Sequence, residues 1–287
     1  MQRILLHLDT DPLPSSFDRI VAIDAGADRV LSYGGVAPEN VEPLVHGAIF
    51  TRAPDELRHT AIFIGGSDAA AGEALFEKVR GTFFGPLRVS VMLDSNGSNT
   101  TAAAAVLAAA KHMELSGAEA LVLGGTGPVG QRAAQLLARQ GAKVRLASRS
   151  IDRAQAACER IAEFVRSSPG AAPPRITPCE NGDPGALEGV ALIVAAGAPG
   201  VELLSAEELR SIETLQVAID LNALPPAGLA GIAATDKAQD EGRVVRYGAI
   251  GVGGAKMKIH RAAIKKLFKS NDRLLDAEAI FEIGERL

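Results

Sequence analysis

Tryptophan is absent from this sequence of 287 residues, and cysteine occurs only twice. The cysteines, Cys158 and Cys179, form no C-x-x-C motif, so they indicate neither a disulfide framework nor a zinc site. The formal net charge of −4 and the few aromatic residues leave no basic stripe interleaved with aromatic side chains, which argues against a nucleic-acid partner. No run approaches the roughly 18 apolar residues of a membrane span. We therefore expect a cytoplasmic protein without a metal, a membrane or a nucleic acid as partner.

Glycine, in contrast, is abundant, and some of it forms a recognisable pattern. The apolar run 120–123 leads into a turn of the form G-x-G-x-x-G, made by Gly125, Gly127 and Gly130. A helical pattern follows, and the segment 143–147 then has the character of a second strand. In such a unit the turn lets the backbone approach a pyrophosphate, and the helix N-terminus donates amide hydrogen bonds to it. The context favours dinucleotide binding over the alternative of an ordinary glycine-rich turn.

The end of the second strand indicates which dinucleotide is bound. Chains that prefer NAD carry an Asp or Glu there, which binds the ribose 2′-hydroxyl; this chain has Ser148, Arg149 and Ser150 instead. A guanidinium and hydroxyls bind a 2′-phosphate that a carboxylate would repel, and Arg153 follows one helical turn later. We therefore expect NADP as the preferred cofactor and NAD as the second choice. The alternative is that Arg149 is only a solvated arginine at a strand end.

Later strand ends complete the predicted cofactor site. The segments 191–197 and 215–221 have strand patterns that end in small or polar residues, and a nicotinamide ribose normally lies across such ends. A further strand pattern, 244–250, precedes a glycine-rich segment. The predicted cofactor-binding residues are Gly125, Thr126, Gly127, Pro128, Val129, Gly130, Ser148, Arg149, Arg153, Ala196, Gly197, Asn222, Ile250 and Gly251.

Strand patterns also alternate with helical patterns in the first hundred residues. This alternation predicts a mostly parallel sheet that is covered on both faces. An alanine-rich helix is expected from about residue 100 to 111. The apolar segments with strand character are 4–8, 29–32, 61–64 and 88–93.

The fold class predicted from these patterns is α/β, with two doubly wound α/β domains. Residues 1–112 plus about 255–287 are expected to form a substrate domain, and residues 113–254 a Rossmann-type dinucleotide-binding domain. An active-site cleft is expected between them. The segment 167–174, rich in serine and proline, is expected to be an exposed loop.

Polar residues follow three of the early strands, at the edge where open parallel sheets bind their ligands. These segments are 9–12, 65–67 and 94–99. The last, Asp94-Ser-Asn-Gly-Ser-Asn99, supplies many hydrogen-bond donors and acceptors with little bulk. Its residues are candidates for substrate binding, and the alternative is that they only turn the chain and cap a helix.

The C-terminal part contributes basic candidates. A helix is expected to begin near Ala255 and to end near Phe268, with Lys256 and His260 on one face. Met257, Ile264 and Leu267 or Phe268 would then form the buried stripe. The other lysines of this helix, at positions 258, 265 and 269, are expected to be solvated.

Five stretches together carry a resemblance to a known family. They are Asp9-Thr-Asp11, Phe17-Asp18, Asp94-Ser-Asn-Gly-Ser-Asn-Thr-Thr-Ala-Ala103, Gly125-Thr-Gly-Pro-Val-Gly130 and Gly248-Ala-Ile-Gly-Val-Gly-Gly-Ala-Lys-Met-Lys-Ile-His-Arg261. Over essentially its whole length the chain resembles the bacterial methylene-tetrahydromethanopterin dehydrogenases of one-carbon metabolism. The two long stretches are specific, whereas the glycine fingerprint alone would fit many enzymes.

The resemblance implies a reversible hydride transfer between a methylene-tetrahydromethanopterin carrier and NAD(P), which gives the methenyl form. Such a reaction needs no nucleophile or metal, because the positive charge left on the carrier is delocalised over two nitrogens. Catalysis then depends on positioning and on electrostatic support for the developing cation. The resemblance also implies a homo-oligomer, either a trimer or a hexamer built from two trimers.

On this resemblance Asp18 and Lys256 are the expected catalytic residues. A carboxylate has the sign that favours a developing cation, whereas Lys256 is assigned to orienting the substrate. Phe17 is expected to pack on the pterin or on the imidazolidine ring, with core packing as the alternative. The expected substrate-binding residues are Phe17, Asp94, Ser95, Asn96, Asn99, Thr100 and His260.

Three other functions stay open. A methylene-tetrahydrofolate dehydrogenase, with or without cyclohydrolase activity, would perform the same chemistry on another carrier. A non-catalytic NADP-sensing module would bind the nucleotide without turnover. A shikimate- or amino-acid-type dehydrogenase would need a proton relay, for which Lys256 and His260 are suitable.

Overall fold

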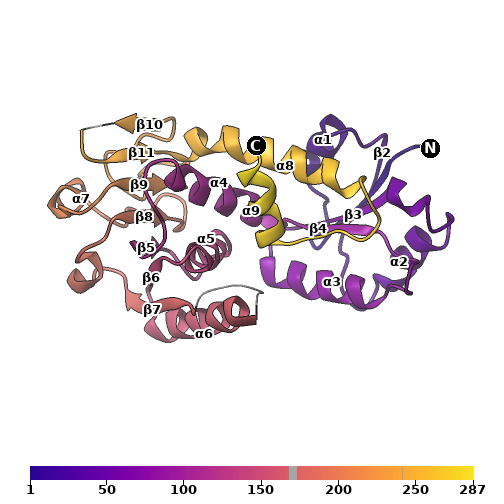
Figure 1. Ribbon diagram of the computed structural model, residues 1–287, viewed down its shortest axis with the longest axis horizontal. Helices are drawn as coiled ribbons and strands as arrows, with labels where there is room; N and C mark the ends of the chain where they lie inside the picture. The colour runs from indigo at the N-terminus through magenta and orange to yellow at the C-terminus, as the bar shows by residue number, and fades with distance from the viewer. Residues whose placement is uncertain (168–172, 241) are drawn as a thin grey trace. The chain divides into compact units, whose positions relative to one another are not determined.

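The computed structural model describes residues 1–167, 173–240 and 242–287 (Figure 1). Its internal contacts divide the chain into an N-terminal unit, Met1–Thr100 with Met257–Leu287, and a central unit, Thr101–Lys256. The expected domain boundaries, after residues 112 and 254, lie 12 residues after the first of these limits and 2 residues before the second. Of the loop expected at 167–174, residues 168–172 lie outside the described residues.

The N-terminal unit is built on a five-stranded parallel sheet with the strand order β2-β1-β3-β4-β12. All four strands expected in this region are confirmed, whereas β12, α2 and α9 were not expected. The strands are β1 (Ile4–Asp9), β2 (Arg29–Tyr33), β3 (Thr60–Gly65), β4 (Ser90–Leu93) and β12 (Leu274–Leu275). The α-helices are α1 (Ser16–Asp24), α2 (Glu42–Ile49), α3 (Ala69–Gly81) and α9 (Ala277–Glu285), with short 3₁₀ helices η1 (Leu57–His59) and η2 (Ser95–Gly97).

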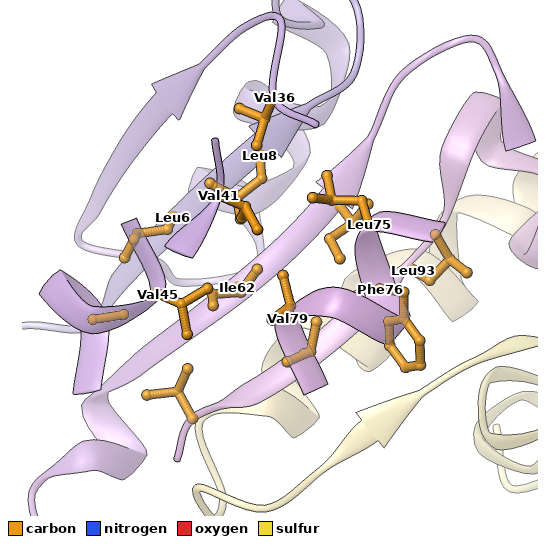
Figure 2. Close-up of a cluster of buried hydrophobic side chains, with 14 of the residues drawn as sticks. Leu6, Leu8, Val36, Val41, Val45, Ile62, Leu75, Phe76, Val79 and Leu93 are labelled. Carbon is orange, nitrogen blue, oxygen red and sulfur yellow. The ribbon is translucent and has the colours of Figure 1, made fainter. Parts of the chain in front are cut away.

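The two faces of this sheet differ in character because side chains alternate along each strand. On β1, Leu6 and Leu8 belong to a buried apolar cluster with side chains of α2 and α3, which Figure 2 shows packed between strands and helices. His7 and Asp9, which alternate with these leucines along the strand, point to the opposite face. There they meet Phe63 of β3, and the start of α1. One face is thus an ordinary core, and the other carries buried polar groups.

The central unit contains a seven-stranded sheet with the order β10-β11-β9-β8-β5-β6-β7, parallel except for β10. Its strands are β5 (Glu119–Leu123), β6 (Lys143–Ser148), β7 (Arg175–Glu180), β8 (Leu192–Ala195), β9 (Val217–Asp220), β10 (Lys237–Asp240) and β11 (Val245–Tyr247). Its helices are α5 (Pro128–Arg139), α6 (Ile151–Ser167), α7 (Ala206–Ser211) and the short η3 (Pro184–Leu187). The order of the parallel strands, β7-β6-β5-β8-β9-β11, is the Rossmann order, with the topological switch between β5 and β8. The predicted fold class is confirmed.

Two helices, α4 (Ser98–Ala110) and α8 (Ala249–Leu267), contribute residues to both units. The prediction for the start of α8 was wrong, because the helix begins at Ala249 rather than near Ala255. The glycines at its start serve close packing instead of a turn: a Cβ on Gly248 would clash with the carbonyl oxygen of Ala233, and one on Gly251 with that of Asp236. A glycine-rich segment is therefore compatible with a helix when another backbone lies against it.

The buried stripe expected on α8 is largely found. Ile264, Leu267 and Phe268 are buried, while Met257 is only half-buried. The lysines at positions 258, 265 and 269 are exposed, as expected. Among the described residues, no helix combines the length and the apolar character that crossing a lipid bilayer requires.

Candidate functional site

The turn after β5 is shaped by glycines that no other residue can replace. Gly124 has a φ of 67°, and the amide of Gly125 donates to the carbonyl of Ala147, 2.9 Å away. A Cβ on Gly125 would lie 2.5 Å from Cγ of Leu146, and one on Gly130 would lie 2.5 Å from the carbonyl oxygen of Gly124. The turn is thus packed against β6 and against the first turn of α5 so closely that only glycine fits.

The loop after β8 meets this turn at the topological switch. A Cβ on Gly124 would lie 2.6 Å from Cα of Gly197, and the amide of Ala196 donates to Leu123 at 2.9 Å. The N-cap of α5 is Gly127, followed by Pro128, which needs no amide partner. The arrangement points the amides at the start of α5 toward the carboxyl end of the sheet, where an anion is stabilised.

The end of β6 places hydroxyl groups next to the turn. Oγ1 of Thr126 lies 3.3 Å from Oγ of Ser148, and that Oγ accepts a bond from the amide of Ser150. The side-chain amide of Gln131 donates to the carbonyl of Thr126 at 2.8 Å and so holds the turn. Arg149 follows Ser148 and is exposed, as is Arg153 in the first turn of α6.

The remaining predicted cofactor residues lie on other segments. Asn222, after β9, is buried, with its side chain bonded within its own loop: it donates to Pro226 at 3.3 Å and accepts from Leu224 at 3.1 Å. Ile250 and Gly251 form the first turn of α8 and donate to the carbonyl of Ala234. The parts of the predicted cofactor site that meet directly are therefore the ends of β5, β6 and β8.

A buried carboxylate also lies at the end of β9. Burial raises the pKa of Asp220, although the amides of Leu229, Asn222 and Gly228 oppose the shift. The amides of Asn222 and Leu229 donate to its two oxygens at 2.9 and 3.0 Å. Asp220 therefore shapes the loop after β9 rather than offering its carboxylate to a ligand.

In the N-terminal unit the three polar segments expected at strand ends do come together. The carboxylate of Asp11 accepts bonds from the amide and the hydroxyl of Ser67, at 2.9 and 2.8 Å. The amide of Asn96 donates to Gly66 at 2.6 Å. The ends of β1, β3 and β4 thus form one edge, as the parallel arrangement predicted.

Most side chains of the segment 94–99 are engaged in hydrogen bonds with neighbouring residues of the chain. Asp94 accepts from the amide of Thr100 at 3.0 Å and from its hydroxyl at 2.7 Å, and Asn99 donates to Leu93 at 2.6 Å. Asp94, Ser95, Asn99 and Thr100 are each at most 1% exposed. Asn96 differs: it is exposed and has a left-handed φ of 54°. The capping alternative thus describes much of this segment, and Asn96 is the residue presented to solvent.

Phe17 is 48% exposed, so it does not pack in the core. Its ring lies 6.3 Å from that of His260, and His260 in turn stacks on Phe63, with the ring centres 5.7 Å apart and the planes 13° apart. His260 is fully buried, with Nδ1 3.9 Å from Oδ2 of Asp94. Asp18 and Lys256 are half-buried.

Two residues of this cluster, His7 and Phe63, were not among the predicted site residues. His7 is 1% exposed, with Nε2 3.3 Å from Oδ2 of Asp9, and its ring meets Phe63 edge-on. Burial lowers the pKa of His7, although Asp18 and Asp9 act in the opposite direction. The signal in the sequence is a histidine in the middle of the apolar strand Ile4-Leu-Leu-His-Leu8, where a polar residue needs a partner.

A cavity of about 460 Å³ in the central unit is separate from these residues. It lies over β5 and β6, beside η3 and α7, and none of the predicted cofactor-binding residues lines it. Among the described residues, no group of three or more histidine, cysteine, aspartate or glutamate side chains is arranged to hold a metal ion.

Known proteins resemble the chain in sequence. The family model "Methylene-tetrahydromethanopterin dehydrogenase, N-terminal" matches residues 16–96. The bifunctional protein MdtA of Methylorubrum extorquens is 45% identical over 292 residues, which cover 100% of this chain and 99% of that protein. The NAD(P)-dependent methylenetetrahydromethanopterin dehydrogenase of the same organism is 33% identical over 291 residues, with 96% of this chain and 95% of that protein covered.

A solved structure shares the fold without close sequence similarity. Quinate dehydrogenase of Corynebacterium glutamicum, in complex with NAD, aligns over 100% of both chains with a TM-score of 0.51 and 13% identity. It supports the α/β fold alone. On the sequence relatives, which match it over nearly their full lengths, the chain belongs to the methylene-tetrahydromethanopterin dehydrogenase family.

Proposed function

We propose that this chain is an NAD(P)-dependent methylene-tetrahydromethanopterin dehydrogenase that prefers NADP. It transfers a hydride reversibly between the methylene carrier and the nicotinamide cofactor, and the oxidised carrier is the methenyl form. The observation that carries the proposal is the family membership, based on relatives that match the chain over nearly its whole length. The glycine turn at the switch between β5 and β8 supplies the dinucleotide site that this reaction requires.

The central unit fits a dinucleotide. Gly125 and Gly130 let the turn pack closely against β6 and the first turn of α5, and a tight glycine turn at a helix N-terminus is the arrangement that binds a pyrophosphate. Ser148, with Arg149 beside it, suits a 2′-phosphate, which supports NADP over NAD. When bound, NADP supplies the hydride acceptor. Thr126, Pro128, Val129, Ala196 and Gly197 complete this side, and Asn222, Ile250 and Gly251 are proposed to line it from the loop after β9 and from the first turn of α8.

The N-terminal unit is proposed to bind the carrier. Phe17 offers an exposed aromatic face for stacking on a heterocycle, and Asp18, on the same helix, has the charge that favours a cationic product. Asn96 is the exposed polar residue at the end of β4. The buried residues Asp94, Ser95, Asn99, Thr100 and His260 are proposed to support this surface from beneath. Lys256 is proposed to orient the carrier through its ammonium group.

The location and the oligomeric state of the chain are also part of the proposal. The chain is proposed to work in the cytoplasm as a homo-oligomer, a trimer or a hexamer. A methylene-tetrahydrofolate dehydrogenase is the second candidate, because the two carriers share the same reacting group. An NADP-sensing module without turnover is the third.

The test is the reduction of NADP and of NAD, followed at 340 nm, with methylene-tetrahydromethanopterin and methylene-tetrahydrofolate in parallel. The proposal expects the highest kcat/KM with NADP and the methanopterin carrier. A higher kcat/KM for the folate carrier would show that methylene-tetrahydrofolate is the substrate instead. Binding of NADP without any turnover would favour the sensing module. Lys256→Ala should lower kcat/KM for the carrier, whereas Lys258→Ala, a change at an exposed lysine of the same helix, should not.

A further inference from the structure

Two titratable side chains of β1 are buried where an ordinary core would have apolar residues. His7 and Asp9 are each 1% exposed, and they lie on the sheet face opposite the apolar cluster of Leu6 and Leu8. Taking a carboxylate and an imidazole out of water costs free energy that only close partners offset. Such a pair therefore requires an explanation beyond packing.

Asp9 holds the beginning of α1. Its Oδ1 accepts a bond from the amide of Asp11, and its Oδ2 one from the amide of Ser15, both at 2.9 Å. Ser15 is the N-cap of α1, and its hydroxyl accepts a bond from the amide of Asp18 at 3.2 Å. The carboxylate thus fixes the loop and the cap from which Phe17 and Asp18 extend.

His7 holds Asp9 in turn. Its Nε2 lies 3.3 Å from Oδ2 of Asp9, and on its other side Nδ1 lies 3.5 Å from the hydroxyl of Ser32 on the neighbouring strand. A Cβ on Gly65 would lie only 2.9 Å from Nε2 of His7. His7 and Asp9 of β1 are therefore enclosed by residues of β2 and β3. These neighbours restrict the imidazole ring to one orientation.

A second connection runs through aromatic rings. The centre of the His7 ring lies 5.5 Å from that of Phe63 with the planes at 66°. Phe63 stacks on His260 at 5.7 Å, and His260 lies 6.3 Å from Phe17. Each of these spacings is within the range of favourable ring pairs. Phe17 is thus supported both from its own helix cap and from beneath its ring.

We propose that His7 is a positioning residue of the carrier site, acting on Phe17 and Asp18 through Asp9 and through the rings of Phe63 and His260. The inference rests on the proposed function, in which Phe17 and Asp18 contact the carrier. His7 itself is buried and touches neither carrier nor cofactor in this role. It determines where the two contact residues stand.

The kinetic test compares two substitutions. His7→Leu removes the imidazole nitrogen that lies 3.3 Å from Asp9, whereas His7→Gln keeps an N–H near the position of Nε2. We expect His7→Leu to raise KM for the methylene carrier about tenfold, less than the roughly hundredfold loss that a 1 Å misplacement can cause, with KM for NADP unchanged. His7→Gln should restore most of the loss. His46→Leu, on α2, is the matched control and should behave as the wild type.

Amide hydrogen exchange gives a readout that needs no turnover. In His7→Leu, exchange of the segment 10–24 should become about tenfold faster, because the amides of Asp11 and Ser15 lose their fixed acceptor. The segment 128–139 should not change, and His7→Gln should match the wild type in both. Unchanged KM and unchanged exchange in His7→Leu would overturn the inference. So would an equal loss in both variants that extends to NADP, since that would show a role in folding only. If the wild type does not turn over the methanopterin carrier but exchange in His7→Leu still accelerates, the proposed substrate fails while the effect of His7 on α1 stands.

Discussion

The two units of this chain share an architecture but build their strand-end sites from different material. In the central unit the edge after β5 and β8 consists of backbone, with glycines at each place where a Cβ would clash. In the N-terminal unit the edge after β1, β3 and β4 is organised by buried side chains, above all His7, Asp9, Asp94 and His260. Backbone amides suit a phosphate, which every dinucleotide presents in the same way. Side chains held by other side chains suit the shape of one heterocycle.

The largest expected effect tests the backbone side of this contrast. Gly130→Ala places a Cβ 2.5 Å from the carbonyl oxygen of Gly124, so the turn must move away from α5. We expect NADP to bind about a hundredfold more weakly, the upper range for overpacking at a rigid contact. Gly47→Ala is the control, because a Cβ there meets nothing within 4 Å. Isothermal titration calorimetry measures the affinity of each variant for NADP. Equal affinities of Gly130→Ala and Gly47→Ala would contradict the packing argument.

A second effect tests the side-chain edge. Thr100→Val keeps the shape of the side chain but removes the hydroxyl that donates to Asp94 at 2.7 Å. A buried carboxylate then loses a charge-assisted bond, so the free energy of unfolding should fall by about 2 kcal/mol. Thr101→Val, one residue later and half-buried, should change it by less than about 0.5 kcal/mol. Urea titration measures the free energy of unfolding of both variants. A value for Thr100→Val equal to that of the wild type would show that the burial of Asp94 does not depend on this bond.

The preference for NADP depends on one exposed charge and is expected to be a smaller effect. Arg149→Ala should lower kcat/KM for NADP about tenfold, since the pair with a phosphate is partly screened by solvent, and should leave kcat/KM for NAD unchanged. Arg166→Ala, an exposed arginine in the last turn of α6, serves as control. An equal decrease for both nucleotides would remove Arg149 from the discrimination between them.

The smallest effect is a pH dependence. Burial lowers the pKa of His7 below its ordinary value of 6.5, so the unfolded chain binds this proton more readily than the folded one. Above pH 6.5 His7 is neutral in both states, and the free energy of unfolding does not depend on its protonation. As the pH falls from 6.5 toward the lower pKa of the folded state, the unfolded chain takes up the proton first, so the free energy of unfolding falls by at most about 1.4 kcal/mol per pH unit. His7→Gln should therefore show a shallower loss between pH 7 and 5, and His46→Gln should not. Parallel slopes for all three proteins would refute this account of His7.

The sequence reveals much of the architecture because periodicity and strand ends are local signals. The strand before Gly125 and the helix after it follow from a few neighbouring residues, and so does the position of Ser148. The sequence does not reveal features that depend on contacts between residues far apart in the chain. That α8 begins at Ala249 depends on the backbone of 233–236 packed against its glycines, and β12 forms only by pairing with β4.

The site divides in the same way. The edge of polar segments was predictable, because parallel strands bring their carboxyl ends together. The burial of Asp94 and His260 was not predictable, because the exposure of these side chains depends on which helix covers the sheet. His7 is the clearest example: the register with Phe63 on β3 shows that a histidine in an apolar strand lies beside the other buried rings of this sheet face. The predicted domain boundaries, the cleft and the individual site residues stay predictions.

Binding of both ligands to two variants tests the contrast most directly. Calorimetry with NADP and, separately, with the methenyl carrier is carried out on the wild type, on Gly130→Ala and on Phe17→Ala. The account predicts that Gly130→Ala loses NADP and keeps the carrier, and that Phe17→Ala loses the carrier and keeps NADP. If Phe17→Ala binds the carrier as tightly as the wild type does, or if one substitution abolishes both bindings, the assignment of one ligand to each unit is wrong.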